Sequence, residues 1–269
     1  MNTSMPDPAY LAESRATEVI IWFSIPIPII VLTTILRLYV RLATIPRSRL
    51  KYDDYLIVCA AIASLTASAL GLAFGPPYGF GQHLVLVPPD HFKMFMMGNY
   101  IFSHFYNLAI ATAKLSVLAL YHRLFWVKLW FRRLVIITSV FVTVWLLSME
   151  LFLLFGWQPI SDWWSGTGED FVHITPFGYF ANITNLLTNL LIFAMPIPVI
   201  LKIQINLNKR IGMCFLFSFG LGTCIISAVR LFWIFSLLST DITWDQVPLG
   251  VLSVWEMCMG VLCGNLPVV

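Results

Sequence analysis

Charge is scarce in this sequence. Charged residues make up 11% of its 269 residues and hydrophobic residues 59%, whereas soluble domains average about 25% and about 45–50% respectively. This composition excludes an ordinary water-soluble domain. The net charge of +3 is small and gives no indication of a polyanionic partner, so no nucleic acid is expected to bind.

Several residues that common cofactors and cross-links require are also missing. No lysine follows Lys209, so the last helix cannot form a retinal Schiff base. The five histidines form no His-x-x-x-His or Glu-x-x-His pair on one helix face, which leaves a metal site without support. The five cysteines all lie in apolar segments, where they are expected to be small packing residues and not disulfides. The sequence therefore predicts no cofactor and no metal.

Seven long apolar segments are present instead. They are Val19–Leu36, Tyr55–Phe74, Met94–Leu120, Leu134–Phe155, Phe177–Leu201, Ile211–Leu238 and Val247–Val269. A helix needs about 20 apolar residues to cross about 30 Å of hydrocarbon, and a spanning segment must pair its backbone groups internally. We predict an all-α polytopic membrane protein with seven transmembrane helices in a lipid bilayer. Residues 1–18 form a short tail and residues 19–269 the transmembrane domain.

The loops alternate in charge. The first, third and fifth connections hold 12 of the 16 Lys and Arg residues, whereas the N-terminal tail and the even-numbered loops hold nine of the 13 Asp and Glu residues. The positive-inside rule then predicts an extracellular or luminal N-terminus and a cytoplasmic C-terminus. The tail has no signal-peptide pattern, so the first helix is expected to direct the chain to the plasma membrane or an endomembrane.

Four ionisable residues lie inside the predicted spans, where charge is costly and function is the default expectation. They are Lys114, Glu150, Arg230 and Glu256. A rise of about 1.5 Å per residue places the last three toward the outer side and Lys114 in the cytoplasmic half. Arg230 and Glu256 are predicted to be the charged pair of an outward-opening pocket, and Glu256 and Glu150 are the candidate catalytic acids.

Polar residues recur at helical spacing on four spans, which predicts that these helices face one another around a polar interior. The candidate ligand-binding residues are Arg230, Glu256, Glu150, His104, Asn107, Asn185 and Asn189. The alternative interpretation is that these side chains only join the helices through hydrogen bonds. An Arg–Glu pair can also satisfy itself and have no further role.

Two aspartates begin the second span. Asp53 and Asp54 are candidate partners of Lys114, and at least one of them is expected to cap the helix and to favour its N-terminal dipole. Together with Arg123, at the end of the third span, these residues form the predicted structural or switch set at the inner face.

Short motifs follow one another along most of the chain. They are Arg37-x-Tyr39-x-Arg41, Asp53-Asp54-Tyr55, Gly79-x-Gly81-x-His83, Lys114-x-Ser116, Tyr121-x-Arg123-Leu124-Phe125, Pro196-Ile197-Pro198, Gly220 with Arg230, Asp241-x-Thr243-Trp244, and Trp255-Glu256 followed by Pro267. In this order the chain resembles the fungal rhodopsin-domain integral membrane proteins from about Arg37 to Pro267. The resemblance implies seven helices and implies that Lys114, Arg230 and Glu256 belong to a family pattern. That family includes receptor-like proteins and proteins encoded in toxin-biosynthesis clusters.

The sequence also departs from the pattern of that family. Trp157 stands where the first of a cysteine pair is common, and Asn189 replaces an acid that usually precedes the Pro-x-Pro. The third helix ends in Tyr121-His122-Arg123, unlike the Glu/Asp-Arg-Tyr motif of animal receptors, and the sequence ends at the seventh helix. Several surfaces that a receptor uses for coupling are therefore reduced, and the cytoplasmic coupling partner is unknown.

Three functional hypotheses follow. The first is a receptor-like protein whose outer pocket takes a small lipophilic molecule. The second is a membrane-bound enzyme or accessory factor of fungal secondary metabolism, in which Glu256 or Glu150 protonates a lipophilic intermediate to start a cyclisation or isomerisation. Whether the chain is an enzyme is left open. A transporter is disfavoured, because the fifth and sixth spans show no clear helix break.

Overall fold

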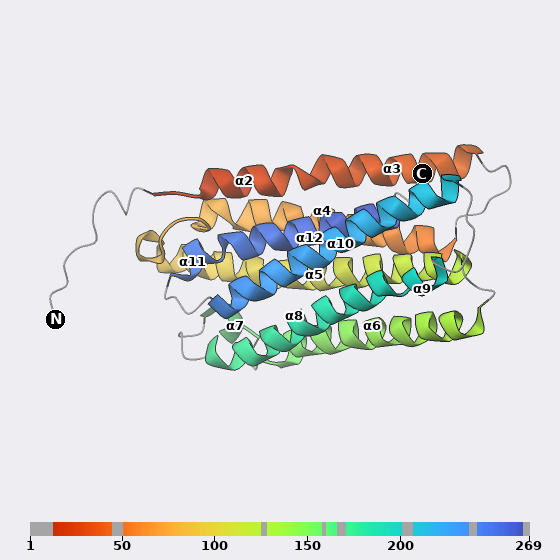
Figure 1. Cartoon of the computed structure of the whole chain (residues 1–269). Coiled ribbons are helices and arrows are strands. Elements are labelled where there is room, and N and C mark those ends of the chain that lie inside the picture. Colours follow the sequence, from red (N-terminus) through yellow and green to blue (C-terminus); the bar gives the residue numbers. More distant parts are fainter. Residues whose placement is uncertain are drawn as a thin grey trace.

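The computed structural model describes residues 13–44, 51–124, 128–157, 160–165, 171–200, 207–236 and 241–265. Within these ranges the regular secondary structure is helical and includes no strand. The helices are α2 (Ala16–Ser24), α3 (Pro26–Thr44), α4 (Tyr52–Phe74), η1 (Pro76–Tyr78), η2 (Leu84–Leu86), α5 (Pro89–Leu124), α6 (Leu129–Phe155), α7 (Asp162–Ser165), α8 (Phe171–Ala194), α9 (Ile197–Ile200), α10 (Leu207–Ser236), α11 (Ile242–Asp245) and α12 (Val247–Asn265). Figure 1 shows the long helices side by side along a common axis. The predicted all-α fold is confirmed.

Six helical segments of the described chain are long and apolar enough to cross a membrane. They are Ala16–Ala43, Tyr52–Tyr78, Leu129–Phe155, Phe177–Ala194, Phe217–Phe235 and Ile242–Asn265. The long helix α5 runs alongside them (Figure 1) and corresponds to the predicted third span. The protein is thus a multi-pass membrane protein. The orientation of its ends across the bilayer stays a prediction.

The helix α5 is less apolar than the others because it is enclosed by them. It packs against α4, α6 and α12, and its buried residues include the polar Thr112, Lys114 and Ser116. A helix surrounded by protein needs no continuous apolar face toward lipid. With 36 residues it extends about 54 Å, so it passes beyond both limits of the predicted span Met94–Leu120.

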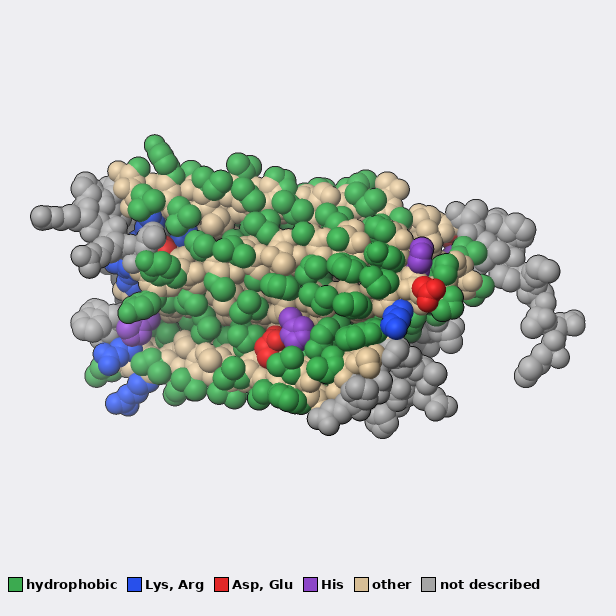
Figure 2. Space-filling view, turned by 180° about the vertical axis from the view of Figure 1, so that it is seen from behind, with side chains coloured by type: hydrophobic (Ala, Val, Ile, Leu, Met, Phe, Trp, Pro, Cys, Tyr) green, Lys and Arg blue, Asp and Glu red, His purple; other side chains and the backbone are tan. Residues whose placement is uncertain are grey.

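The outer surface of the bundle is apolar. Leu32, Ile62, Ile137 and Val144 are each more than half exposed, and Figure 2 shows hydrophobic side chains along the length of one side. This is the arrangement expected where the solvent is lipid. Lys and Arg side chains gather at one end in the same view. We call this end, which carries Arg37, Arg41 and Arg123, the basic end, and the end with η1, η2, α7 and α11 the cap end.

Proline interrupts two of the predicted spans. The first is divided into α2 and α3 before Pro26, and the fifth turns at Met195-Pro196 between α8 and α9. Proline lacks a backbone N–H and its ring clashes with the preceding turn, so a helix kinks or ends there. The expectation that the fifth span has no helix break is therefore wrong. The same expectation holds for the sixth span, because α10 is continuous from Leu207 to Ser236.

Candidate functional site

The predicted charged pair is present in the middle of the bundle. Arg230 on α10 lies against Glu256 on α12, with 3.1 Å between Nη1 and Oε2. The Glu256 side chain is 1% exposed, whereas that of Arg230 is 15% exposed. An ion pair this deep in a membrane protein is held by additional hydrogen bonds, because removing both charges from water is costly.

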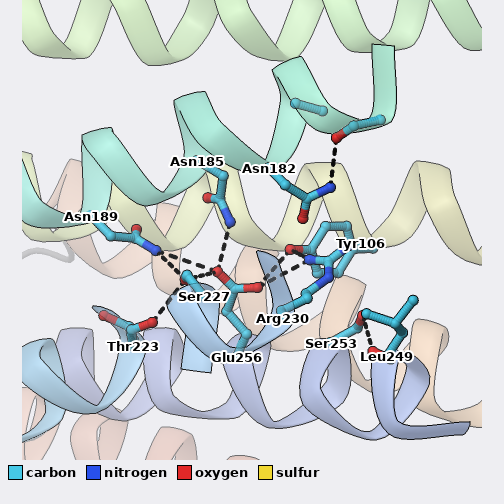
Figure 3. Close-up of polar contacts among 12 residues, drawn as sticks. Tyr106, Asn182, Asn185, Asn189, Thr223, Ser227, Arg230, Leu249, Ser253 and Glu256 are labelled. Atoms are coloured by element: carbon cyan, nitrogen blue, oxygen red, sulfur yellow. Dashed lines mark hydrogen bonds and ion pairs between the residues drawn. The ribbon is translucent and has the colours of Figure 1, made fainter. Parts of the chain in front are cut away.

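Glu256 is surrounded by hydrogen-bond donors from three other helices (Figure 3). Its Oε1 accepts hydrogen bonds from Ser227 Oγ at 2.5 Å, Asn185 Nδ2 at 2.7 Å and Asn189 Nδ2 at 3.3 Å, and its Oε2 accepts from Tyr106 Oη at 2.7 Å and from Arg230. We call these six residues the Glu256 cluster. A carboxylate offers about four acceptor positions, so this set of donors fills both of its oxygens.

The cluster confirms that polar residues of the fifth, sixth and seventh predicted spans face one another. It joins α5, α8, α10 and α12, and four of its residues were candidate ligand-binding residues from the sequence, namely Asn185, Asn189, Arg230 and Glu256. Tyr106 was missed, because it lies beside Asn107 and away from the stripe that was read along α5. A buried tyrosine hydroxyl needs a polar partner, and this is the signal that points to it. The Arg230 guanidinium also lies over the Tyr106 ring, with Cζ 4.4 Å from the ring centroid.

The predicted pairing of Lys114 with Asp53 or Asp54 is wrong. Lys114 Nζ donates to Asn185 Oδ1 at 2.5 Å and to Thr188 Oγ1 at 2.6 Å, both on α8. The reason is the direction of the side chain. Ser116, two residues further along α5, donates to the backbone oxygen of Asp53, and residues two apart point to nearly opposite faces of a helix.

Asp53 and Asp54 instead belong to a second polar cluster at the basic end. Arg37 Nη2 lies 2.9 Å from Asp53 Oδ2 and 2.8 Å from Asp54 Oδ1. Arg41 is 3.1 Å and Arg123 is 3.2 Å from Asp53. The backbone N–H of Lys51 donates to Asp54 Oδ2 at 3.0 Å, which confirms that one of the two aspartates caps α4.

Arg37 connects this basic-end cluster to the last helix. Its side chain is 0% exposed, and its Nη1 donates to the backbone oxygen of Gly264 on α12. Gly264 is eight residues from Glu256, a distance of about 12 Å along the helix axis. The helix α12 therefore contacts both clusters.

His104 and Glu150 lie apart from the Glu256 cluster. They pair with each other across α5 and α6, with 2.5 Å between Nδ1 and Oε2, and their side chains are 23% and 28% exposed. Neither residue lines the cavities described next. Asn107, by contrast, lines the smaller cavity beside Arg230.

Two cavities meet at Arg230. The larger has a volume of about 500 Å³ and reaches from Arg230 to the cap end, between walls that include Phe74, Phe80 and Phe95. The smaller has a volume of about 150 Å³ and is lined by Asn107, Asn182 and Trp145 among others. Ser103, Tyr106, Trp163, Gly178 and Arg230 line both. Glu256 lines neither of them, but borders a third cavity of about 50 Å³ together with Lys114.

Two sequence motifs meet over the cap end. In the loop Gly79–His83, Gly81 N donates to Thr243 O at 3.0 Å, and His83 Nδ1 lies 2.6 Å from Asp241 Oδ2. The His83 ring stacks on Trp244. These contacts hold the loop against α11, close to Phe80 and Ile242 of the larger cavity.

Gly81 provides a test of this arrangement. Its φ is +89°, and an added Cβ would lie 2.9 Å from Ala16 N and from the carbonyl carbon of Arg15. We expect Gly81→Ala to lower the free energy of unfolding by about 1–2 kcal/mol, which thermal unfolding in detergent would detect. Gly222→Ala is the control, because its Cβ would approach only Met259 Sδ, at 3.8 Å. Equal melting temperatures for the two variants would contradict the required left-handed backbone.

Comparison with known proteins gives one match. Residues 36–269 match the family model described as the fungal rhodopsin domain. No curated protein and no solved structure matches the chain.

Proposed function

The chain belongs to the fungal rhodopsin domain family, and we propose that it is a receptor-like membrane protein that binds a small lipophilic molecule in the larger cavity. Ligand sites are usually concave, mostly apolar and about 300–1,000 Å³ in volume, with a few polar groups that orient the ligand. A cavity of about 500 Å³ with aromatic walls and Arg230 at its inner limit has these properties.

The observation that carries the proposal is the double role of Arg230. One side of its side chain lines the cavity, and its Nη1 is bound to Glu256 and Tyr106. A ligand that contacts Arg230 therefore acts on the residues that join α5, α8, α10 and α12. A ligand shifts a conformational equilibrium only through contacts that differ between the two states, and here such contacts lie one side chain away from the helix junction.

The basic-end cluster supplies a second element for signal transmission. The helix α12 connects Glu256 to Gly264, which accepts a hydrogen bond from Arg37. In the proposed mechanism, a small movement of α12 at Glu256 changes the packing of Arg37, Asp53 and Arg123 at the other end. Arg123 is 29% exposed and is the member of this cluster most accessible to a coupling partner.

The enzyme hypothesis receives less support from this geometry. A general acid must reach the group that it protonates, at about 2.6–3.2 Å. Glu256 is 1% exposed and its oxygens are occupied by five donors, while Glu150 is bound to His104 outside the cavities. The test of the enzyme hypothesis compares the metabolites of cells that carry the unsubstituted protein with those of cells that carry Glu256→Gln, at equal amounts of the protein in the membrane. Accumulation of one precursor in the variant would indicate an enzyme.

Gly178 allows the cavity to be filled without disturbing its walls. This residue lines both cavities, and a Cβ built on it meets no atom of the described residues within 4 Å. We expect Gly178→Leu to reduce photolabelling of cavity residues by about tenfold or more, since overpacking an occupied site costs about 1–3 kcal/mol. The probe is a methyl palmitate that carries a diazirine in its chain, applied to the full chain in nanodiscs of zwitterionic lipid.

The matched control is Gly178→Ala, which increases helix propensity by a similar amount but adds little volume. It should leave the labelling of the cavity unchanged. The proposal fails if the probe labels only lipid-facing residues, or if Gly178→Leu labels the cavity as strongly as the unsubstituted protein does.

A further inference from the structure

The Arg230 guanidinium has an edge that donates no hydrogen bond to the described residues. Among the described residues, its hydrogen bonds to Tyr106 and Glu256 both leave from Nη1. Its Nε–H is buried and has no hydrogen-bond partner in the described part of the chain. Nε and Nη2 form the side of the planar fork that binds a carboxylate or phosphate through two parallel hydrogen bonds.

A buried donor without a partner is costly to retain, by about 1–3 kcal/mol. Its position therefore suggests that a group from outside the described chain accepts from it. The stacking of the guanidinium on Tyr106, 4.4 Å from the ring centroid, keeps the plane of the fork fixed. Arg230 is thus oriented before any ligand arrives, which lowers the entropy cost of binding.

The charge balance of the interior favours an anion. The charged residues among those that line the three cavities are Lys114, Arg230 and Glu256. Two cations thus face one carboxylate, and within the described part of the chain the acceptors of the Lys114 hydrogen bonds, on Asn185 and Thr188, are neutral. Buried charges are expected to be paired, so one bound negative charge would bring the formal charge of this set to zero.

The two cavities at Arg230 both combine apolar walls with polar side chains. The larger is bounded mainly by aromatic and apolar side chains such as Phe74 and Phe95. The smaller places Asn107 and Asn182 near Arg230, and Figure 3 shows Asn182 on the Arg230 side of the cluster and Asn189 on the other side. Both cavities thus offer apolar surface to the body of a ligand, and polar side chains lie near Arg230 where a charged head group would bind.

We propose that the ligand of the larger cavity is an amphiphilic anion, a molecule with an apolar body and a single carboxylate or comparable anionic oxygen group. The anionic group binds the Nε–Nη2 edge of Arg230, and the apolar body fills the aromatic cavity toward the cap end. This assignment rests on the proposed function, since it names the chemical class of the molecule that the cavity takes. The anionic group and Glu256 would thus bind different edges of one guanidinium.

The test compares diazirine-bearing palmitic acid with its methyl ester on the full chain in nanodiscs. We expect the acid to label cavity residues at concentrations at least about tenfold lower than the ester, since hydrogen bonds to charged groups are worth more than neutral ones. Arg230→Gln should reduce labelling by the acid to the level of the ester, and Arg230→Lys should retain part of the preference. The control is Lys93→Gln, which removes an exposed cation from the same helix as Tyr106. It should leave labelling by the acid and labelling by the ester unchanged.

The outcomes separate the two proposals. If acid and ester label the cavity equally, the cavity still takes lipophilic molecules and the anionic assignment is wrong. If neither labels the cavity, the proposed function fails and this assignment fails with it. Nanodiscs that contain phosphatidic acid distinguish the source of the anion. Loss of labelling by the acid in those nanodiscs assigns the site to a membrane lipid, and unchanged labelling assigns it to a free amphiphile.

Discussion

Replacing Arg37 by methionine should lower the free energy of unfolding by about 3–5 kcal/mol, because it leaves buried carboxylates without their main partner. Arg37 is 0% exposed and lies within 3 Å of both Asp53 and Asp54. The substitution also removes the donor to Gly264 O on α12. Reversible unfolding in mixed micelles, monitored by circular dichroism, would measure the change.

Two further variants test whether the loss of stability comes from the buried guanidinium of Arg37. Arg133→Met removes an exposed charge from α6 at the same end and should change the free energy of unfolding by less than about 0.5 kcal/mol. Arg37→Lys should fall between the two, because an ammonium keeps the charge but cannot reproduce the planar fork that contacts both aspartates. A loss of less than about 1 kcal/mol for Arg37→Met would show that Arg41 and Arg123 can replace it.

Replacing Glu256 by leucine should destabilise the protein by a similar amount, about 3–5 kcal/mol. This change removes the carboxylate that accepts from Tyr106, Asn185 and Ser227 and leaves Arg230 without its counter-charge. Lys114 also loses the closest buried negative charge among the residues that line the cavities. The same unfolding measurement applies.

The double variant Glu256→Leu with Arg230→Met tests whether the two residues act as a pair. When both charges are removed, no unpaired ion remains, so the combined loss should be smaller than the sum of the single losses by about 1–3 kcal/mol. The single variant Arg230→Met completes the cycle. Strict additivity would mean that Arg230 and Glu256 are stabilised independently, and it would remove the basis for transmission from the cavity to the helix junction.

The membrane architecture was accessible from the sequence because it depends on local composition. Each span had to supply enough apolar residues for the hydrocarbon thickness, and this requirement is visible without any knowledge of contacts. The helix α5 was found even though it is less apolar than the others, since its apolar stretch Met94–Leu120 is long. The cost of intramembrane charge likewise selected Arg230 and Glu256, which the structure brings within 3.1 Å.

The hydrogen-bond partners of most polar residues could not be predicted as well from the sequence. Hydropathy does not specify how far each helix is rotated about its axis, and a rotation of one residue position is about 100°. For this reason Lys114 was assigned to Asp53 or Asp54, whereas it binds Asn185 and Thr188. The same uncertainty concealed Tyr106, and it grouped His104 and Glu150 with a pocket that they do not line.

The sequence by itself determined that this chain is a helical multi-pass membrane protein and that Lys114, Glu150, Arg230 and Glu256 lie on its long helices. Both properties follow from the type and spacing of residues along a single span. Only the tertiary structure decided that Glu256 receives five donors, that Arg37 holds Asp53 and Asp54, and that Arg230 stands between two cavities. These features depend on the rotation and register of neighbouring helices. Both are set by side-chain packing between segments far apart in the chain.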